Sequence, residues 1–251
     1  MLKEERQLRI LEILRTEGKL VATDLSGALG VSEDTVRRDL RELAEVGKLQ
    51  RVHGGALPRS VVSDTYKGRR QQETAGKQAV ARAAVTLVEN GQVIVLDGGT
   101  TALEVVRYLP PDLEATVVTH SPTTAAALAE HPAVEVVVIG GILHKNGIVA
   151  VGAETVEAYS SVNADVCLQG IWSIHPEVGI SLPNFEEARV KRAMIESANR
   201  VVALASAEKL GTVSSFGVAP ASAFTHLVTE STVPDEILEP FRKLGLEVVT
   251  G

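Results

Sequence analysis

The sequence has few of the features that mark secreted or membrane-bound proteins. Its 251 residues include one cysteine, Cys167, which excludes an internal disulfide and indicates a reducing compartment. No apolar run approaches the length of a membrane-spanning helix, and the first residues, MLKEERQ, lack the apolar core of a signal peptide. Aromatic residues make up only 3% of the chain, so its core must be aliphatic. We therefore expect a cytoplasmic protein without a membrane partner.

Short motifs of several enzyme and metal-binding classes are also missing. The sequence contains no Gly-x-Ser-x-Gly, no His-x-x-x-His pair and no cluster of cysteine with histidine. Cys167 lies in the apolar run DVCLQGIW and is interpreted as a small core residue. The six histidines are scattered and lack the spacing of a metal site. We interpret His53, His131, His144, His175 and His226 as loop or surface residues, and His120 as the one with a ligand-facing position. We expect neither a metal site nor a cofactor.

The negative net charge of −7 is unevenly distributed. Residues 1–60 contain 11 basic and 10 acidic side chains, whereas the rest of the chain contains 14 and 22. Within residues 37–59 there are six basic side chains and three acidic ones. A local basic patch on a nearly neutral segment suits a sequence-specific DNA-binding module better than general coating of nucleic acid.

A helix beginning at Ser32 is the most informative prediction from the first sixty residues. Ser32 is a good N-cap, and Val36, Leu40 and Leu43 recur at helical spacing to form an apolar face. The side chains left off that face are Thr35, Arg37, Arg38 and Arg41. Arginine carries forked donors suited to phosphates and guanine edges. Taken alone, an amphipathic helix with arginines is more often a charged, solvent-exposed helix of a small helical domain than a DNA-binding helix.

The neighbouring segments favour a DNA-binding interpretation. They predict a helix over residues 4–17 with Leu8, Ile10, Leu11 and Leu14 on a helical period, and a short helix over residues 23–29. Gly30-Val31 supplies a turn, Gly47 ends the Ser32 helix, and residues 49–57 are extended around Gly54-Gly55. This order of elements is that of a winged helix-turn-helix, with Arg51 and His53 on the wing.

The remainder of the chain predicts an α/β domain. Residues 58–74 are polar and indicate a linker that leads into a helix over residues 74–89. Short β-branched runs then alternate with helical stretches, at residues 92–96, 115–119, 134–139, 165–169, 200–205, 226–229 and 246–250. Apolar strands that alternate with helices imply a largely parallel sheet covered on both faces, whose ligands bind beyond the carboxyl ends of the strands.

The first strand-end loop has the composition of a phosphate site. Its residues are Asp97, Gly98, Gly99, Thr100 and Thr101, between a strand and a helix. Glycines let backbone N–H groups approach an anion, and the helix N-terminus carries partial positive charge. The loop alone does not separate this function from an ordinary turn.

Four further segments are expected at the same edge of the sheet. They contribute His120 and Ser121, then Gly140 and Gly141 before a polar hairpin, then Glu187 and Lys191, and finally Lys209. Glu187 and Lys191 are four residues apart on a helix and could equally form a surface ion pair. The convergence of hydroxyl- and phosphate-binding residue types on one edge favours a binding site.

Several motifs resemble those of the DeoR family of transcriptional repressors. They are VSEDTVRRDLREL, LQRVHGGA, LDGGTTALEVVRYL, VVTHS, VIGGILHKNGIVAVG and EEARVKRAMIESANRVV, which together cover nearly the whole chain. The resemblance implies that the Ser32 helix is the recognition helix, with Ser32, Thr35, Arg37 and Arg38 contacting DNA. It also implies a second domain similar in fold to ribose-5-phosphate isomerase, which senses a phosphorylated sugar or related metabolite and mediates oligomerisation.

Two segments depart from the family pattern. Gly170-Ile171-Trp172-Ser173 replaces a turn with an acidic residue between glycines, and residues 205–209, ASAEK, replace Asp-Ser-Ser-Lys. The lysine is retained as Lys209, whereas an acid and a hydroxyl are lost. We expect the bulky Trp172 to narrow or reshape the pocket.

These observations predict a winged helix-turn-helix over residues 1–57, a linker over 58–74 and an effector-binding, oligomerising domain over 75–251. The expected function is repression of carbohydrate-metabolism genes by a homodimer or homotetramer that binds an operator and a phosphorylated effector. The alternative is an enzyme, a sugar-phosphate isomerase or deaminase with a DNA-binding head, for which Glu187 is the best candidate base. A repressor is favoured, and no catalytic residue is assigned.

Overall fold

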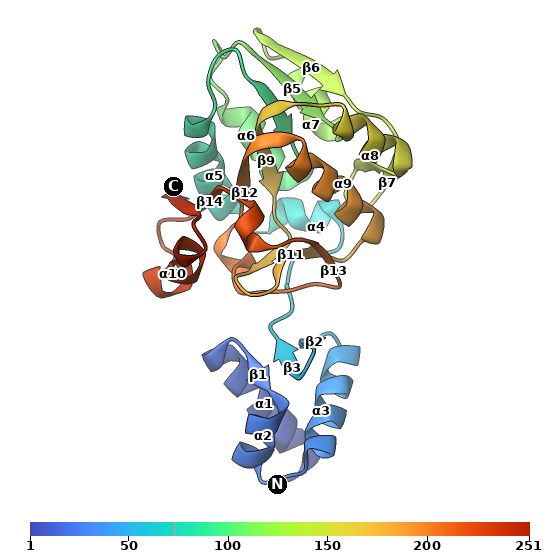
Figure 1. The fold of residues 1–251 in the computed structure, drawn as a ribbon, viewed down its shortest axis with the longest axis vertical. Helices are drawn as coiled ribbons and strands as arrows, with labels where there is room; N and C mark the ends of the chain where they lie inside the picture. Colours follow the sequence, from blue (N-terminus) through green and yellow to red (C-terminus); the bar gives the residue numbers. More distant parts are fainter. Residues whose placement is uncertain (73) are drawn as a thin grey trace.

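The computed structural model describes residues 1–72 and 74–251. A small N-terminal domain is joined by an extended segment to a larger α/β domain (Figure 1). In the described part of the chain, no helix combines the length and the apolar character needed to cross a membrane.

The N-terminal domain is the predicted winged helix-turn-helix. Its elements are α1 (Lys3–Glu17), β1 (Leu20–Val21), α2 (Ala22–Leu29), α3 (Glu33–Glu45), β2 (Gln50–Val52) and β3 (Gly55–Leu57). Ile10 and Leu14 of α1 pack with Val36 and Leu40 of α3 in its core. Leu8, which was expected on the same helical period, is 62% exposed and lies outside this core.

A close approach between β1 and β3 explains why the wing contains Gly55. The two strands pair antiparallel, with Val21 opposite Gly55. A Cβ atom at Gly55 would lie 1.7 Å from the carbonyl oxygen of Leu20, which is far inside van der Waals contact. Glycine is therefore required where the wing closes on the helical core.

The second domain is built on a seven-stranded parallel sheet, as predicted. Its strands are β4 (Val93–Leu96), β5 (Ala115–Thr119), β6 (Val134–Val138), β9 (Ala164–Gly170), β12 (Ala198–Leu204), β14 (His226–Thr229) and β15 (Glu247–Thr250). The spatial order is β15-β14-β12-β9-β4-β5-β6. After β4 the chain builds β5 and β6 on one side, and later strands fill the other side, so β4 and β9 flank the point where the strand order reverses.

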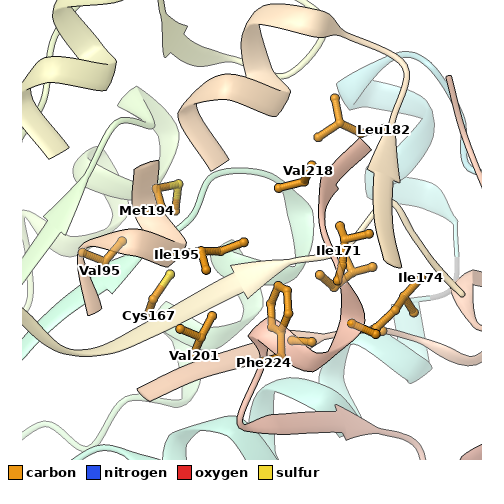
Figure 2. Close-up of a cluster of buried hydrophobic side chains, with 14 of the residues drawn as sticks. Val95, Cys167, Ile171, Ile174, Leu182, Met194, Ile195, Val201, Val218 and Phe224 are labelled. Atoms are coloured by element: carbon orange, nitrogen blue, oxygen red, sulfur yellow. The ribbon is translucent and has the colours of Figure 1, made fainter. Parts of the chain in front are cut away.

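Alternate residues of the strands supply two separate cores. Ile94 and Leu96 face a core shared with α5 (Thr74–Ala84), α6 (Thr100–Tyr108) and α7 (Pro122–Leu128). The opposite core packs against α8 (Ala153–Ser160), α9 (Phe185–Glu196) and α10 (Asp235–Lys243). Figure 2 shows Val95 and Cys167 of this second core beside Met194 of α9, so Cys167 is a buried core residue.

The smaller elements were not predicted as strands or were predicted differently. A hairpin of β7 (Ile142–His144) and β8 (Val149–Val151) contains the polar turn that was expected after Gly141. A separate antiparallel sheet contains β10 (Ser173–His175), β11 (Gly179–Leu182) and β13 (Phe216–Ala219). The helix expected over residues 74–89 is shorter in the structure: α5 ends at Ala84, and the 3-10 turn η1 (Val85–Leu87) follows it.

The segment between the two domains, residues 58–72, is called the connector below. It was expected to be irregular, but it contains a short helix, α4 (Tyr66–Gln71), capped by the hydroxyl of Thr65. Its first residues are bound to the α/β domain, since Val213 N–H donates to the Pro58 carbonyl and Ser60 N–H donates to the Val213 carbonyl. Residue 73 of the predicted linker lies outside the described residues, and residue 74 begins α5. The connector therefore packs on the α/β domain.

Candidate DNA-binding face and effector pocket

Helix α3, which is the expected recognition helix, begins as the sequence predicts. The hydroxyl of Ser32 accepts a hydrogen bond from the Thr35 N–H at 3.3 Å, which caps α3. The outward-facing arginines of this helix, Arg37, Arg38 and Arg41, are all exposed. Arg37 forms an exposed ion pair with Glu33 at 3.0 Å, one turn earlier, and such a surface pair is readily exchanged for a phosphate.

A buried ion pair removes one negative charge from this face. Asp39 of α3 is almost fully buried and binds the guanidinium of Arg6 on α1. The hydrogen bond to Asp39 raises the pKa of Arg6. Because Asp39 is turned inward and neutralised, the exposed arginines are not opposed by its charge.

The structure brings part of the predicted DNA-binding set together in one hollow. The hollow lies between α3 and the wing and is lined by Ala22, Arg37, Leu40, Arg51, Val52, His53, Gly54 and Gly55. Arg38 and Arg41 lie on the same helix outside this hollow. The wing and α3 thus present Arg37, Arg51 and His53 to a common space.

A second pocket lies beyond the carboxyl ends of β4, β9 and β12, where the strand order reverses. Seven of the predicted effector residues line it: Gly98, Gly99, Thr100, Thr101, Glu187, Lys191 and Lys209. The other lining residues are Val62, Arg69, Gln72, Lys77, Gly147, Val149, Gly170, Ile171, Trp172 and Glu208. The topology therefore places the pocket where ligands of such sheets bind.

The glycine loop after β4 has the geometry of an anion site. Gly99 adopts φ +92° and is the N-cap of α6, so the first N–H groups of this nine-residue helix have no partner within it. A Cβ atom at Gly98 would lie 2.2 Å from the Val149 side chain. Glycine is therefore needed at Gly99 for the positive φ and at Gly98 for close packing against Val149.

Asp97 does not face the pocket but fixes one of its lysines. Its carboxylate is 1% exposed, accepts from the N–H groups of Gly98 at 2.7 Å and Gly170 at 2.9 Å, and binds the ammonium of Lys191. Lys191 also donates to the Gly170 carbonyl at 2.8 Å. Asp97 thus joins the ends of β4 and β9 and neutralises Lys191.

Lys209 is the buried cation of the pocket that lacks such a partner. Residues 1–72 and 74–251 offer no hydrogen bond or ion pair to its ammonium group, and the side chain is 5% exposed. Burial lowers the pKa of Lys209 to about 8, and the neighbouring Glu208 offsets part of that effect. The Oε2 atom of Glu208 is itself buried without a hydrogen-bond partner in the described part of the chain. An anion would compensate Lys209, and a ligand hydroxyl would compensate Glu208.

Glu187 is the other acidic residue of the pocket. Its Oε2 atom lies 3.8 Å from Nε2 of His144, and burial raises the pKa of its carboxyl. The backbone N–H of Glu187 is capped by Asn184 at the start of α9. A buried carboxyl in this position can accept from or donate to ligand hydroxyl groups.

Five predicted effector residues lie outside the lining of the pocket: Asp97, His120, Ser121, Gly140 and Gly141. His120 is fully buried, its Nδ1 lies 2.9 Å from the Tyr159 hydroxyl, and burial lowers its pKa to about 4. The side chain therefore points into the core as a neutral imidazole. Gly141 closes on α8, because a Cβ atom there would lie 2.0 Å from the Thr155 hydroxyl oxygen.

Sequence reasoning did not find the contribution of the connector and α5. Arg69 and Gln72 come from residues that were predicted as a linker, and Lys77 comes from α5. The cluster of basic residues in YKGRRQ was a usable signal, but only the tertiary structure places Arg69 beside Trp172. In the described part of the chain, no three His, Cys, Asp or Glu side chains converge in a group that could hold a metal ion.

Two family models match the chain. A DeoR-like helix-turn-helix domain matches residues 6–60, and the DeoR C-terminal sensor domain matches residues 72–231.

Curated relatives cover most of the chain. The transcriptional regulator GlpR of Haloferax volcanii is 36% identical over 100% of this chain and 99% of its own. The repressor GlcR of Bacillus subtilis is 31% identical over 99% of this chain and 96% of its own. The glycerol-3-phosphate regulon repressor of Haemophilus influenzae is 32% identical over 81% of this chain and 80% of its own.

Solved structures with detectable likeness are more distant. Ribose 5-phosphate isomerase A of Methanocaldococcus jannaschii is 20% identical, with a TM-score of 0.39 over 53% of this chain and 52% of that one. The sorbitol operon regulator SorC of Klebsiella pneumoniae is 15% identical, with a TM-score of 0.38 over 82% of this chain and 89% of that one. Likeness at this level supports no inference about function.

Proposed function

Because the chain belongs to the DeoR family of DNA-binding transcriptional regulators, we propose that it represses carbohydrate-metabolism genes under the control of a phosphorylated sugar or related metabolite. The observation that carries the ligand assignment is Lys209, a buried cation without an anionic partner in the described residues, beside the N-terminus of α6. The name of the Haemophilus influenzae relative, a glycerol-3-phosphate regulon repressor, points to the same chemical class. The family and the relatives are regulators, so the alternative of an isomerase or deaminase is not favoured.

The DNA-binding residues proposed are Ser32, Thr35, Arg37, Arg38, Arg41, Arg51 and His53. All lie on α3, at its N-cap or on the wing, and none is buried. In a winged helix-turn-helix the recognition helix enters the major groove and its first turns contact base edges. Operators on the chromosome would place the protein in the cytoplasm.

The effector is proposed to bind with its phosphate at the loop of residues 98–101. Backbone N–H groups at the start of α6 and the two threonine hydroxyls would donate to the phosphate, and Lys209 would supply the charge. Lys191 would donate with its remaining proton, because two of its bonds are already made to Asp97 and Gly170. Glu187 and Glu208 would bind sugar hydroxyls.

We propose residues 1–57 as the DNA-binding domain and residues 75–251 as the effector-binding domain, with the intervening segment packed on the latter. We also propose a homodimer or homotetramer held by the α/β domain. Strand β6 is an edge of the main sheet, and exposed apolar residues gather there and on β7: Val137, Val138, Ile142 and Leu143. An exposed apolar sheet edge of this kind suits pairing with a second copy.

A thermal-shift screen against phosphorylated metabolites tests the proposal. A ligand at a hundred times its Kd stabilises the fold by about 2.7 kcal/mol, which is readily measured. Lys209→Met should lose the shift, whereas Lys145→Met, an exposed change on the β7–β8 turn, should keep it. If no phosphorylated compound stabilises the protein, the assignment of the ligand class is wrong.

A further inference from the structure

The connector forms one wall of the effector pocket through Arg69. The guanidinium of Arg69 donates to three carbonyl oxygens, those of Ser63 and Asp64 at 3.1 Å and of Asn146 at 2.7 Å. Residues 1–72 and 74–251 provide no carboxylate in an ion pair with it. Its direct hydrogen-bond acceptors are therefore neutral, and the carboxylates of Glu187 and Asp64 act on its charge only through space.

Arg69 is also stacked on an aromatic ring. Its central carbon lies 5.2 Å from the centroid of the Trp172 ring, within the range of a cation–π contact. These two residues, with Gly147 and Glu187, line the pocket on one side and a second hollow on the other. The stacked pair is thus a partition between the pocket and the outer hollow.

The same pair is connected to the wing of the DNA-binding domain. The hydroxyl of Ser60 donates to the Trp172 carbonyl at 3.1 Å, and Ser60 and Pro58 form the two backbone hydrogen bonds to Val213. Pro58 directly follows Leu57, the last residue of β3. Residues 58–60 and their hydrogen bonds therefore join Trp172 to the end of the wing.

We propose, on the basis of the effector pocket assigned above, that Arg69 is an effector-binding residue. When the effector binds, Arg69 leaves the Trp172 ring and binds an anionic oxygen of the effector. The connector transmits this change to the wing. A charge-assisted hydrogen bond contributes more than a part-exposed cation–π contact, so an anion in the pocket would favour the exchange. Burial lowers the pKa of Arg69, as expected for a cation that its surroundings compensate only in part. Through this change of partner at Arg69, the connector takes part in sensing the effector.

Trp172 is the only tryptophan of the chain, so the tryptophan emission of the protein comes from this residue, and comparison with Arg69→Met isolates the part that depends on the contact with Arg69. The experiment titrates the full-length protein with inorganic phosphate, glycerol 3-phosphate and fructose 6-phosphate, and follows both tryptophan emission and binding by calorimetry. We expect the emission of the wild type to change with the same midpoint as binding. Arg69→Met should bind the probe at least tenfold more weakly and, when saturated, lose most of the emission change seen in the wild type.

Two further variants separate this mechanism from a non-specific loss of structure. Arg70→Met makes the same change at the neighbouring exposed arginine of α4 and should behave as wild type in both measurements. Ser60→Ala changes no residue that lines the pocket, but removes the hydrogen bond from the Ser60 hydroxyl to the Trp172 carbonyl and the one it accepts from the Val62 N–H. It should retain the emission change while the probe alters operator affinity at least threefold less than in the wild type.

The outcomes distinguish this inference from the proposed function. If no probe binds the wild type, or if the bound probe does not protect residues 98–101 from hydrogen exchange, the proposed effector pocket fails and the inference fails with it. If a probe binds and protects residues 98–101, but Arg69→Met keeps wild-type affinity or the full emission change, the inference alone is overturned.

Discussion

The ammonium of Lys191 is bound to the buried carboxylate of Asp97, at the point where strands β4 and β9 end side by side. The pair ties the glycine loop to the turn after β9, because Asp97 also accepts from the Gly170 N–H. Lys191 is therefore a neutralised part of the scaffold. Lys209, in the same pocket, has no such partner in the described residues, so the two lysines should respond differently to mutation.

Replacing the two lysines by methionine should change stability in opposite directions. Lys191→Met leaves Asp97 as a buried unpaired charge and should destabilise the protein by about 3–5 kcal/mol. Lys209→Met removes a buried cation and should stabilise the effector-free protein by about 1–3 kcal/mol at pH 7. Urea denaturation of both variants and the wild type gives the two free energies of unfolding.

The pH dependence of the free energy of unfolding tests whether burial of the charged Lys209 destabilises the protein. Its pKa in the folded protein, about 8, is below the ordinary value of 10.5. The cost of burying its charge is thus fully present below pH 8 and is relieved as the pH rises to about 10.5. The wild type should gain stability relative to Lys209→Met over this window, and a constant difference would contradict the assignment.

Effector affinity should also depend on pH through Lys209. Binding an anion requires the charged lysine, so above pH 8 each complex must take up a proton. Affinity for a phosphorylated probe should fall by up to about tenfold per pH unit above pH 8. Calorimetry in buffers of different ionisation enthalpy measures the proton uptake. Equal affinity at pH 7.5 and pH 9.5 would show that Lys209 does not face the anion.

The seven strands of the main sheet could be predicted because buried parallel strands are continuous apolar runs, such as VIVL over residues 93–96. Strand β10, with Ser173 and His175, is too short and too polar to show a pattern. Helix α4 was missed because YKGRRQ contains a glycine and no apolar periodicity.

The candidate site was predicted as far as topology determines it. Their positions at strand ends predicted that residues 98–101 and Lys209 lie at one edge of the sheet, and in the structure they line one pocket. It could not give the direction of a side chain, so His120, also at a strand end, was expected to face the ligand although it packs against Tyr159. Arg69 could not be predicted, because its place depends on packing against a residue far along the chain.

Replacing Arg37 or Arg38 by alanine should weaken operator binding. If the side chain contacts a base, the loss should be about 1–3 kcal/mol for the operator and smaller for other DNA. If it contacts a phosphate, the loss should be similar for all sequences, and the salt slope should fall by about one. Fluorescence anisotropy at several salt concentrations separates the cases. Unchanged affinity and slope in both variants would falsify the assignment of α3.

Charge at the exposed edge of the sheet should weaken the proposed oligomer. Val138→Glu with Ile142→Glu places two carboxylates on the apolar surface of β6 and β7. Both side chains are more than half exposed, so the fold of the monomer should survive. Light scattering at micromolar concentration should show the wild type as a dimer or tetramer and the variant as a smaller species. A monomeric wild type, with and without operator DNA, would argue against the oligomer.

Control of DNA binding from the pocket is tested most directly by operator affinity against a titrated effector, in the wild type and in two pocket variants. Gly99→Val forces a β-branched residue into the left-handed conformation at φ +92°, and Lys209→Met removes the charge. Because neither change touches the DNA-binding domain, both variants should bind the operator as the wild type does without effector, and both should lose the response to effector. A normal effector response in both variants would place the effector site elsewhere on the sheet.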